Sequence, residues 1–452
     1  MQEHPGTEDA CPLAAVDQRL ADAHSLWHQA EAAYFDPAGF RLAVQNAIQT
    51  LRTVTFILQK HKAIIPNFAE WYGDTEKKTQ GEWQRRLRSD PLMRWMVDAR
   101  NRIEKQGDLE SNSMVRAEIV ASYLEEGPRI EVPAHLSDTI KTLVYNIPNN
   151  ALGEHVRRNG MLRIRRRWVE NTLPDYELLD AVAVAYGKVA ELVHDAHRQI
   201  GLDPPPTIHD DDGRSYDLPS MGWRFPCMIG HELPRTLLIS LADGSRIEFE
   251  TKCVPMKFDA VKVAALMERY GGNPFAAMRR DYKTDADLAA GYFTLIRAMF
   301  LRDGYHQTML FLFRDRKVVG QPIGVAFENV QHKYALMRQL AAEVTKSGAD
   351  AAMLVGEAWK ASANELKPYE RPADSPVRTE ALTLHLVSKN GASFDCEAEI
   401  IRDGEKVSLG ETQVADQSAA FEFAPFLQVW GRPVPDSWME TSRMIKAAAK
   451  RE

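Results

Sequence analysis

A long amphipathic stretch near the amino terminus constrains the fold of this chain more than any other feature. Asp36 and Pro37 supply a helix start, with the aspartate as N-cap and the proline in the first turn. From Ala38 to about Lys60, apolar residues recur at helical spacing, which predicts a helix of about 22 residues. A helix of this length needs other helices to cover its apolar stripe, so the sequence predicts a bundle. The stripe consists of Phe40, Leu42, Ala43, Ile48, Leu51, Val54, Ile57 and Leu58.

The first 201 residues continue as a helical bundle with a small β insertion. Asp90-Pro91 marks a cap or a kink inside the second long helix. The insertion is indicated where apolar and polar residues begin to alternate. The elements expected around these features are helices at 16–34, 82–103 and 175–200 and strands at 115–123, 129–132 and 161–169.

A proline-rich and acidic stretch at 202–215 is the clearest linker, because proline stiffens a chain and charge keeps it solvated. We therefore expect one domain at 1–201 and a second at 216–452. In the second, Asp243-Gly244 predicts a hairpin turn. A strand, a helix and a strand between 309 and 359 permit a parallel βαβ unit. The predicted fold class is α+β, with a mixed sheet of about five to seven strands in the second domain.

Composition excludes several classes of protein. The chain has 452 residues and a net charge of −7, so the overall charge gives no reason to expect nucleic-acid binding, although a local basic surface remains compatible with it. The four cysteines are scattered without metal-binding spacing, which fits a reducing compartment. The chain contains no apolar run of the roughly 18 residues that a membrane span needs. We expect a cytoplasmic protein with no cofactor, no metal and no membrane partner.

Arg100 and Asn101 form the first candidate site, because an Arg-Asn pair late in a long helix is a common layout for a polar site between packed helices. This pair, in a bundle over about 37–200, resembles the HEPN superfamily, many of whose members are ribonucleases. The resemblance implies a homodimer in which the arginine steadies a phosphate and a following histidine moves the proton.

The sequence departs from that family where the histidine should stand. The expected positions hold Lys105, Gln106 and Gly107, and lysine at its ordinary pKa is a poor base at neutral pH. The resemblance therefore indicates a fold more than a reaction. The alternative is that Arg100 and Asn101 cap or cross-link helices.

A basic run near the end of the insertion is a candidate nucleic-acid site. In a strand over 161–169, arginines at alternate positions share one face and could hold a phosphate backbone. The alternative is a solvated face paired with Glu125, Glu126 and Glu131. The candidate residues are Arg157, Arg158, Arg163, Arg165 and Arg167.

Two further groups of residues could carry chemistry. His194 and His197 have the i, i+3 spacing that can share a metal, but the helix dipole accounts for histidines near a helix end more simply. Glu357 follows an apolar strand, where α/β sheets often hold catalytic groups. A strand-end glutamate also commonly serves as a salt-bridge partner, here of Arg378 or Lys360.

These observations favour an interaction or regulatory protein of bacterial type, with a catalytically degenerate HEPN-like bundle. One alternative is an RNA-binding or RNA-cleaving toxin or defence protein that uses Arg100, Asn101 and the arginines at 163–167. A second alternative is an enzyme with a pocket at Glu357. The sequence leaves open whether the protein is an enzyme at all.

Overall fold

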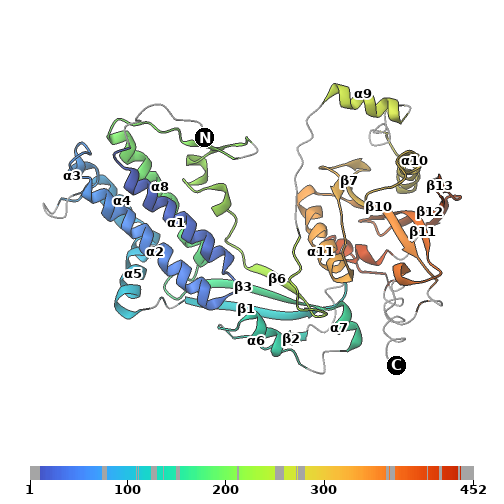
Figure 1. Cartoon of the computed structure of the whole chain (residues 1–452), viewed down its shortest axis with the longest axis horizontal. Helices are drawn as coiled ribbons and strands as arrows, with labels where there is room; N and C mark the ends of the chain where they lie inside the picture. The colour runs from blue at the N-terminus through green and yellow to red at the C-terminus, as the bar shows by residue number, and fades with distance from the viewer. Residues whose placement is uncertain are drawn as a thin grey trace. The chain divides into compact units, whose positions relative to one another are not determined.

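The computed structural model describes most of the chain and divides it into two compact units (Figure 1). The α+β class is confirmed. Unit 1 consists of Met1–Glu118, Glu131–Pro148 and Arg163–Leu237, and unit 2 of Ile119–Ile130, Asn149–Leu162 and Leu238–Glu452. The described residues are 11–73, 79–107, 109, 111–123, 130–135, 137–148, 153–210, 213–249, 259–270, 272, 280–362, 366, 372–404, 406–416, 420–435 and 438.

Unit 1 contains a bundle of long helices, and α1, α2 and α8 run side by side in it (Figure 1). The Asp36 side chain accepts a hydrogen bond from the Ala38 amide, so the predicted start of α2 is confirmed. Leu42 does not belong to the buried stripe, since it is 59% exposed, whereas Phe40 and Ile48 are fully buried. The helices of this unit are α1 (Ala14–Ala32), α2 (Pro37–Lys60), α3 (Phe68–Trp71), α4 (Glu82–Ser89), α5 (Pro91–Gln106), α6 (Ile140–Tyr145) and α8 (Leu178–Gln199).

The single helix expected at 82–103 is two helices, α4 and α5. Asp90 has an extended backbone conformation and accepts a hydrogen bond from the Met93 amide, so it is the N-cap of α5. Pro91 occupies the first helical position, where its missing N–H leaves no bond unmade. The Asp-Pro pair therefore ends one helix and begins the next.

The strands of the predicted β insertion form a four-stranded sheet in the order β2-β1-β3-β6. The division between the two units falls within these strands. The fourth strand comes from the hairpin at Asp243-Gly244, whose turn places Gly244 at a φ of 73°. The bounds are β1 (Ser111–Val120), β2 (Ile130–Val132), β3 (Met161–Glu170) and β6 (Arg235–Ser240).

Unit 2 is built around an eight-stranded sheet in the order β13-β12-β11-β10-β7-β8, with β14 beside β12 and β9 beside β7. Alternate residues of a strand point to opposite faces. Thus Phe311 and Phe313 pack with α10, whereas Leu310 and Leu312 pack with α11 and α12. The strands are β7 (Met309–Arg314), β8 (Lys317–Val318), β9 (Ile323–Gly324), β10 (Ala351–Lys360), β11 (Thr379–Ser388), β12 (Ser393–Asp403), β13 (Lys406–Leu409) and β14 (Gln413–Asp416). The helices are α7 (Glu154–Asn159), α9 (Ala260–Arg269), α10 (Asp285–Asp303), α11 (Val330–Ser347) and α12 (Ala424–Val429).

The parallel βαβ unit expected between 309 and 359 is wrong. Strands β7 and β10 pair antiparallel, with Ala351 opposite Phe313 and Val355 opposite Met309. Every strand pair of this sheet is antiparallel. The chain leaves β7 through the short strands β8 and β9 before α11 begins, so the helix does not make a direct crossover.

The predicted linker at 202–215 lies within unit 1 and contains structure of its own. Strands β4 (Thr207–His209) and β5 (Ser215–Asp217) pair antiparallel there. Two short 3-10 turns follow, η2 (Pro219–Met221) and η3 (Pro226–Met228). Among the described residues, no helix combines the length and the apolar composition needed to cross a bilayer.

Candidate functional site

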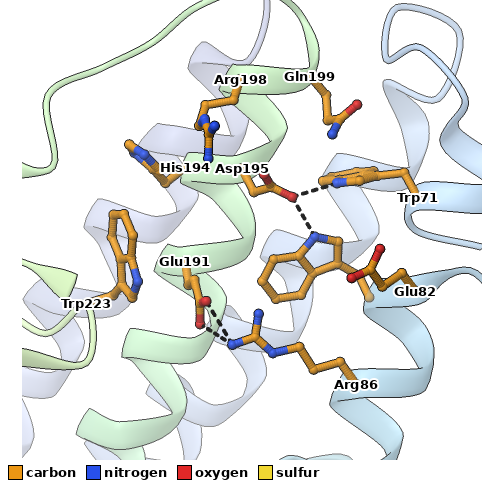
Figure 2. Close-up of a pocket in the computed structure, with 10 residues that line it drawn as sticks. Trp71, Glu82, Arg86, Glu191, His194, Asp195, Arg198, Gln199 and Trp223 are labelled. Atoms are coloured by element: carbon orange, nitrogen blue, oxygen red, sulfur yellow. Dashed lines mark hydrogen bonds and ion pairs between the residues drawn. The ribbon is translucent and has the colours of Figure 1, made fainter. Parts of the chain in front are cut away.

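A polar pocket of about 360 Å³ opens on unit 1 where α3, α4 and the last turns of α8 meet the segment after η2 (Figure 2). Its volume is in the range of ordinary ligand sites. Three indole rings and five charged side chains form most of its wall. The lining residues are Trp71, Glu82, Trp83, Arg86, Glu191, His194, Asp195, Arg198, Gln199 and Trp223.

Two close backbone approaches hold the walls of this pocket in place. A Cβ atom on Gly81 would lie 2.4 Å from the carbonyl carbon of Tyr72, so only glycine lets α4 begin against α3. A Cβ atom on Gly187 would lie 2.1 Å from the carbonyl oxygen of Gly222. Glycine at this position of α8 therefore brings the segment that carries Trp223 onto the helix.

Trp223 has an unusual backbone conformation for a residue with a side chain. Its φ is 61°, in the left-handed region that normally favours glycine. Its amide donates a hydrogen bond of 2.7 Å to the Leu218 carbonyl, which closes the turn around η2. The indole then lies with its ring centre 4.4 Å from that of His194 (Figure 2). Strain of this kind is maintained only where the surrounding structure fixes it.

The carboxylate of Asp195 joins the two other tryptophans. Its Oδ2 accepts hydrogen bonds from Trp71 Nε1 at 2.7 Å and from Trp83 Nε1 at 2.8 Å (Figure 2). Both indoles are nearly buried, with 7% and 6% of their surface exposed. The carboxylate thus satisfies two indole N–H groups that water reaches poorly, and it fixes the orientation of both rings.

A second interaction covers one side of the pocket. One terminal nitrogen of Arg86 lies 2.8 Å from each carboxylate oxygen of Glu191. The same guanidinium lies over the Trp83 ring at 4.6 Å from its centre. The arginine is therefore held by a carboxylate and by an aromatic face.

The charged side chains that line the pocket give it a net negative charge. Burial and the nearby Arg198 lower the pKa of His194 below its ordinary value, which favours the neutral ring at neutral pH. The lining then holds three carboxylates and two guanidinium groups. It includes no serine, threonine or cysteine that could act as a nucleophile. The arrangement suits the binding of a cationic, planar or aliphatic group against indole rings.

Arg100 and Asn101 lie near the end of α5, outside this pocket. The Arg100 guanidinium donates to the Asn101 side-chain oxygen at 3.1 Å and pairs with Glu104 at 2.6 Å. It also lies 5.9 Å from the centre of the Phe56 ring. These contacts link neighbouring turns of α5 and reach toward α2, as in the cross-linking alternative.

The candidate arginines are divided between the two units. Arg157 and Arg158 lie on α7 in unit 2, where Arg158 pairs with Glu154. The other three lie on β3 in unit 1 and differ in exposure: Arg163 is 9% exposed, Arg165 is exposed and Arg167 is half-buried.

Glu118 is the described acidic partner on the neighbouring strand. Arg163 donates to Glu118 Oε1 at 2.8 Å, whereas Arg165 lies 3.8 Å from the same oxygen. Arg167 donates to the Asp175 carbonyl at 3.3 Å. Of the partners expected from the sequence, Glu125, Glu126 and the side chain of Glu131 lie outside the described residues.

Glu357 belongs to an ion cluster at the end of β10. Its carboxylate lies 3.5 Å from Arg402 and accepts a hydrogen bond from the His306 amide. Arg402 also donates to both oxygens of Glu380, at 2.7 and 2.9 Å. The salt-bridge partner is therefore Arg402; the residues expected in that role, Arg378 and Lys360, contact Trp359 and Glu397.

The histidines at i, i+3 spacing face different neighbours. His194 packs against Trp223, whereas His197 lies 3.2 Å from Asp17 and 3.4 Å from Cys11. The hydrogen bond with Asp17 raises the pKa of His197 to about 9. The two rings therefore do not share one ligand, although the sequence placed them on neighbouring helical positions.

The sequence analysis did not identify the wall of the pocket that Trp71, Trp83 and Trp223 form. Trp71 lies between the helices predicted at 38–60 and 82–103, and Trp223 lies just beyond the predicted linker. Asp195 lies between His194 and His197 in the sequence, and its own role was not predicted. The sequence did contain a usable signal, namely tryptophans in polar segments. When such a tryptophan is buried, its indole N–H usually needs a hydrogen-bond partner nearby.

The fold and this site define an α+β protein of two units, with a tryptophan-lined polar pocket in the first. A model of the family described as bacteriophage lambda protein ea47 matches residues 3–447. The chain therefore belongs to the bacteriophage lambda protein ea47 family. Protein ea47 of Escherichia phage lambda is 29% identical over 395 residues, which cover 86% of this chain and 90% of that protein. No solved structure matches the chain.

The family match corrects two expectations. The resemblance to HEPN domains is wrong, because one phage family spans nearly the whole chain and nothing points to a HEPN domain within it. An Arg-Asn pair late in a helix is too common to carry that assignment, and here Arg100 pairs within its own helix. The bacterial type also lacks support, since the matched relative is a phage protein.

Proposed function

We propose that this protein is a phage interaction protein that binds a basic side chain of a partner protein in the pocket of unit 1. The observation that carries the proposal is the combination of three indole rings with an excess of carboxylates in one pocket. Tryptophan and arginine dominate the energetics of protein interfaces. A cation over an indole face gains about 0.5–2 kcal/mol, depending on how far it is desolvated.

The fixed parts of the pocket support recognition more than catalysis. Asp195 is occupied by two indole N–H groups, and Glu191 is occupied by Arg86. A carboxylate that is held in this way orients a surface and is poorly placed to move a proton. Glu82 remains at the exposed rim, where it can meet an incoming cation.

A partner side chain is favoured over a free small molecule because the pocket is bounded by exposed polar groups. Glu82, Arg86 and Arg198 are all exposed. A ring of polar residues around an aromatic centre is the usual anatomy of a protein interface. The phage relative makes host or phage proteins the natural partners.

The test is affinity capture with three forms of the full chain: the wild type, Glu82→Lys and Glu268→Lys. Glu268 lies exposed on α9 in unit 2 and provides the same change of charge away from the pocket. We expect a partner from an Escherichia lysate to bind the wild type and Glu268→Lys equally. Its recovery should fall at least about tenfold with Glu82→Lys, which corresponds to about 1.4 kcal/mol.

The captured partner is then purified and titrated against the same three forms. Equal affinity for Glu82→Lys and the wild type would contradict the proposal. So would a partner contact that maps to acidic side chains and contains no arginine or lysine.

A further inference from the structure

Three side chains of different chemical type meet between the start of α1 and the last turn of α8. Cys11 precedes α1, Asp17 lies in its first turn, and His197 lies in the last turn of α8. The Nε2 atom of His197 lies 3.4 Å from the Cys11 sulfur and 3.2 Å from Asp17 Oδ2. The sulfur and Oδ2 are 3.8 Å apart. Each of the three polar atoms therefore faces the other two.

These distances match the edges of a tetrahedral metal site. Zinc binds sulfur at about 2.3 Å, imidazole nitrogen at about 2.0–2.1 Å and carboxylate oxygen at about 2.0–2.2 Å. At tetrahedral angles, these bond lengths place pairs of ligand atoms about 3.4–3.6 Å apart. The three observed separations, 3.4, 3.2 and 3.8 Å, need to change by only a few tenths of an ångström to fit.

The backbone already fixes which nitrogen of the histidine would bind a metal, and an ion would displace the proton that Asp17 stabilises on Nε2. Its Nδ1 atom lies 2.8 Å from the Val193 carbonyl, which can only accept a hydrogen bond. Nδ1 therefore carries a proton, and in the neutral ring the lone pair is on Nε2, which faces Cys11 and Asp17. A backbone carbonyl on the other nitrogen is the usual support of a metal-binding histidine.

Burial also suits a site that exchanges ions with solvent. His197 is 9% exposed and Cys11 is half-buried, whereas the Asp17 side chain is 43% exposed. The carboxylate thus stands on the open side of the group. An ion can enter past Asp17 and keep a water or another donor in a fourth position.

We propose that Cys11, Asp17 and His197 bind one transition-metal ion of the zinc class. Thiolate and imidazole ligands select such ions over magnesium and calcium, which prefer oxygen. The ion would tie the beginning of α1 to the end of α8. This site departs from the sequence expectation of no metal, because its ligands are 186 residues apart in the chain.

A second group in the same unit provides an internal control. His24, His28 and Cys227 also lie close together, with His24 Nε2 3.2 Å from the Cys227 sulfur. Cys227 is exposed, and His28 pairs with Glu31 at 3.0 Å. Cys227→Ser therefore removes an accessible thiol without touching the proposed ligands.

The experiment uses the full chain, stripped with a chelator and dialysed, then titrated with Zn²⁺ and with Co²⁺. The forms compared are the wild type, Cys11→Ser, Asp17→Asn, His197→Gln and Cys227→Ser. We expect one equivalent of Zn²⁺ per wild-type chain and, with Co²⁺, the visible absorption of a tetrahedral site with a thiolate charge-transfer band. Cys11→Ser should abolish that band, and His197→Gln should weaken Zn²⁺ binding by more than the 10–100-fold cost of losing an outer partner.

Circular dichroism of the metal-free forms separates a lost ligand from a lost fold. Asp17→Asn serves as the mildest variant, since it keeps the shape of the side chain and removes its charge. Added Zn²⁺ should raise the unfolding temperature of the wild type and of Cys227→Ser, but not of Cys11→Ser.

Three results would overturn the proposal. The first is a wild-type chain that binds no stoichiometric Zn²⁺, which would leave a hydrogen-bonded ion pair of Asp17 and His197. The second is a thiolate–cobalt band that survives in Cys11→Ser and disappears in Cys227→Ser, which would place the metal at the other group. The third is unchanged Zn²⁺ affinity in folded His197→Gln.

Discussion

The pocket at the end of α8 and the ion cluster at the end of β10 both place carboxylates beside an arginine, but they differ in what surrounds the charges. Asp195 accepts two hydrogen bonds from nearly buried indoles. Glu357 shares Arg402 with Glu380, and the arginine side chain is 41% exposed. The first arrangement builds a wall of oriented rings, whereas the second is a solvated network. Both carboxylates lie near the end of a helix or strand, so this position does not distinguish the two regions. The groups around each carboxylate do distinguish them.

The largest expected effect comes from removing the acceptor in the pocket. Asp195→Ala leaves the indole N–H groups of Trp71 and Trp83 without a partner, and each hydrogen bond to a charged group contributes about 1.5–3 kcal/mol. We expect the free energy of unfolding of unit 1 to fall by about 3–5 kcal/mol. Urea unfolding followed by tryptophan fluorescence measures it.

Asp195→Asn is the matched control, because its side-chain oxygen still accepts from an indole. It should cost less than half as much as Asp195→Ala. Equal losses for the two variants would mean that the hydrogen bonds do not hold the wall.

A pH dependence sharpens the contrast between buried and solvated carboxylates. Burial raises the pKa of Glu177, the N-cap of α8, from 4.5 to about 7. The pKa of Glu177 is higher in the folded chain than in the unfolded chain. The free energy of unfolding is therefore greatest below pH 4.5, where the carboxyl group is protonated in both states, and it falls as the pH rises to about 7. The full change amounts to about 3 kcal/mol. Glu177→Gln should remove this slope from unfolding free energies measured between pH 4.5 and 7.5; a slope equal to that of the wild type would contradict the assignment.

A smaller effect is expected on β3. Arg163 is 9% exposed and donates to Glu118 at 2.8 Å, so Arg163→Ala should lower the unfolding free energy by about 1–3 kcal/mol. Arg165 is exposed and lies 3.8 Å from the same carboxylate, and its replacement by alanine should cost less than about 0.5 kcal/mol. Chemical unfolding of both variants checks the pair. Similar losses of unfolding free energy at the two positions would show that exposure does not determine how much each arginine stabilises the fold.

The smallest effect is expected at the solvated cluster. Burial raises the pKa of Glu357, and the neighbouring Glu380 raises it further. Glu357→Gln removes one of two carboxylates that compete for Arg402, so the unfolding free energy should change by less than about 1 kcal/mol. A loss as large as that of Asp195→Ala would erase the contrast between the two regions.

The sequence predicted the local elements well where periodicity and caps agreed. Asp36-Pro37 placed the start of α2, and the alternation at 161–169 placed β3. Prediction failed where a decision depended on long-range pairing. The helix between β7 and β10 suggested a parallel crossover, but the intervening short strands allow antiparallel pairing.

The candidate sites stay predictions, because a local sequence pattern does not show which distant residues the fold brings together. Glu357 was chosen by a rule that applies to the carboxyl ends of parallel strands, and its sheet is antiparallel. The residues that line the pocket lie between positions 71 and 223 of the chain, and no local sequence pattern predicts that they come together. A homodimer and RNA binding by the arginines of β3 stay predictions, and the pairing of Arg163 with Glu118 gives RNA binding no support.

The most direct measurement of the central claim is a titration of the full chain with two short peptides, followed by the indole N–H signals in the nuclear magnetic resonance spectrum. One peptide carries a single arginine, and the other carries citrulline, which has the same shape without the charge. We predict that the arginine peptide shifts the signals of Trp223 and Trp83, assigned with Trp223→Phe and Trp83→Phe, and that citrulline shifts them far less. Equal shifts with both peptides, or none with either, would contradict recognition of a basic side chain by this pocket.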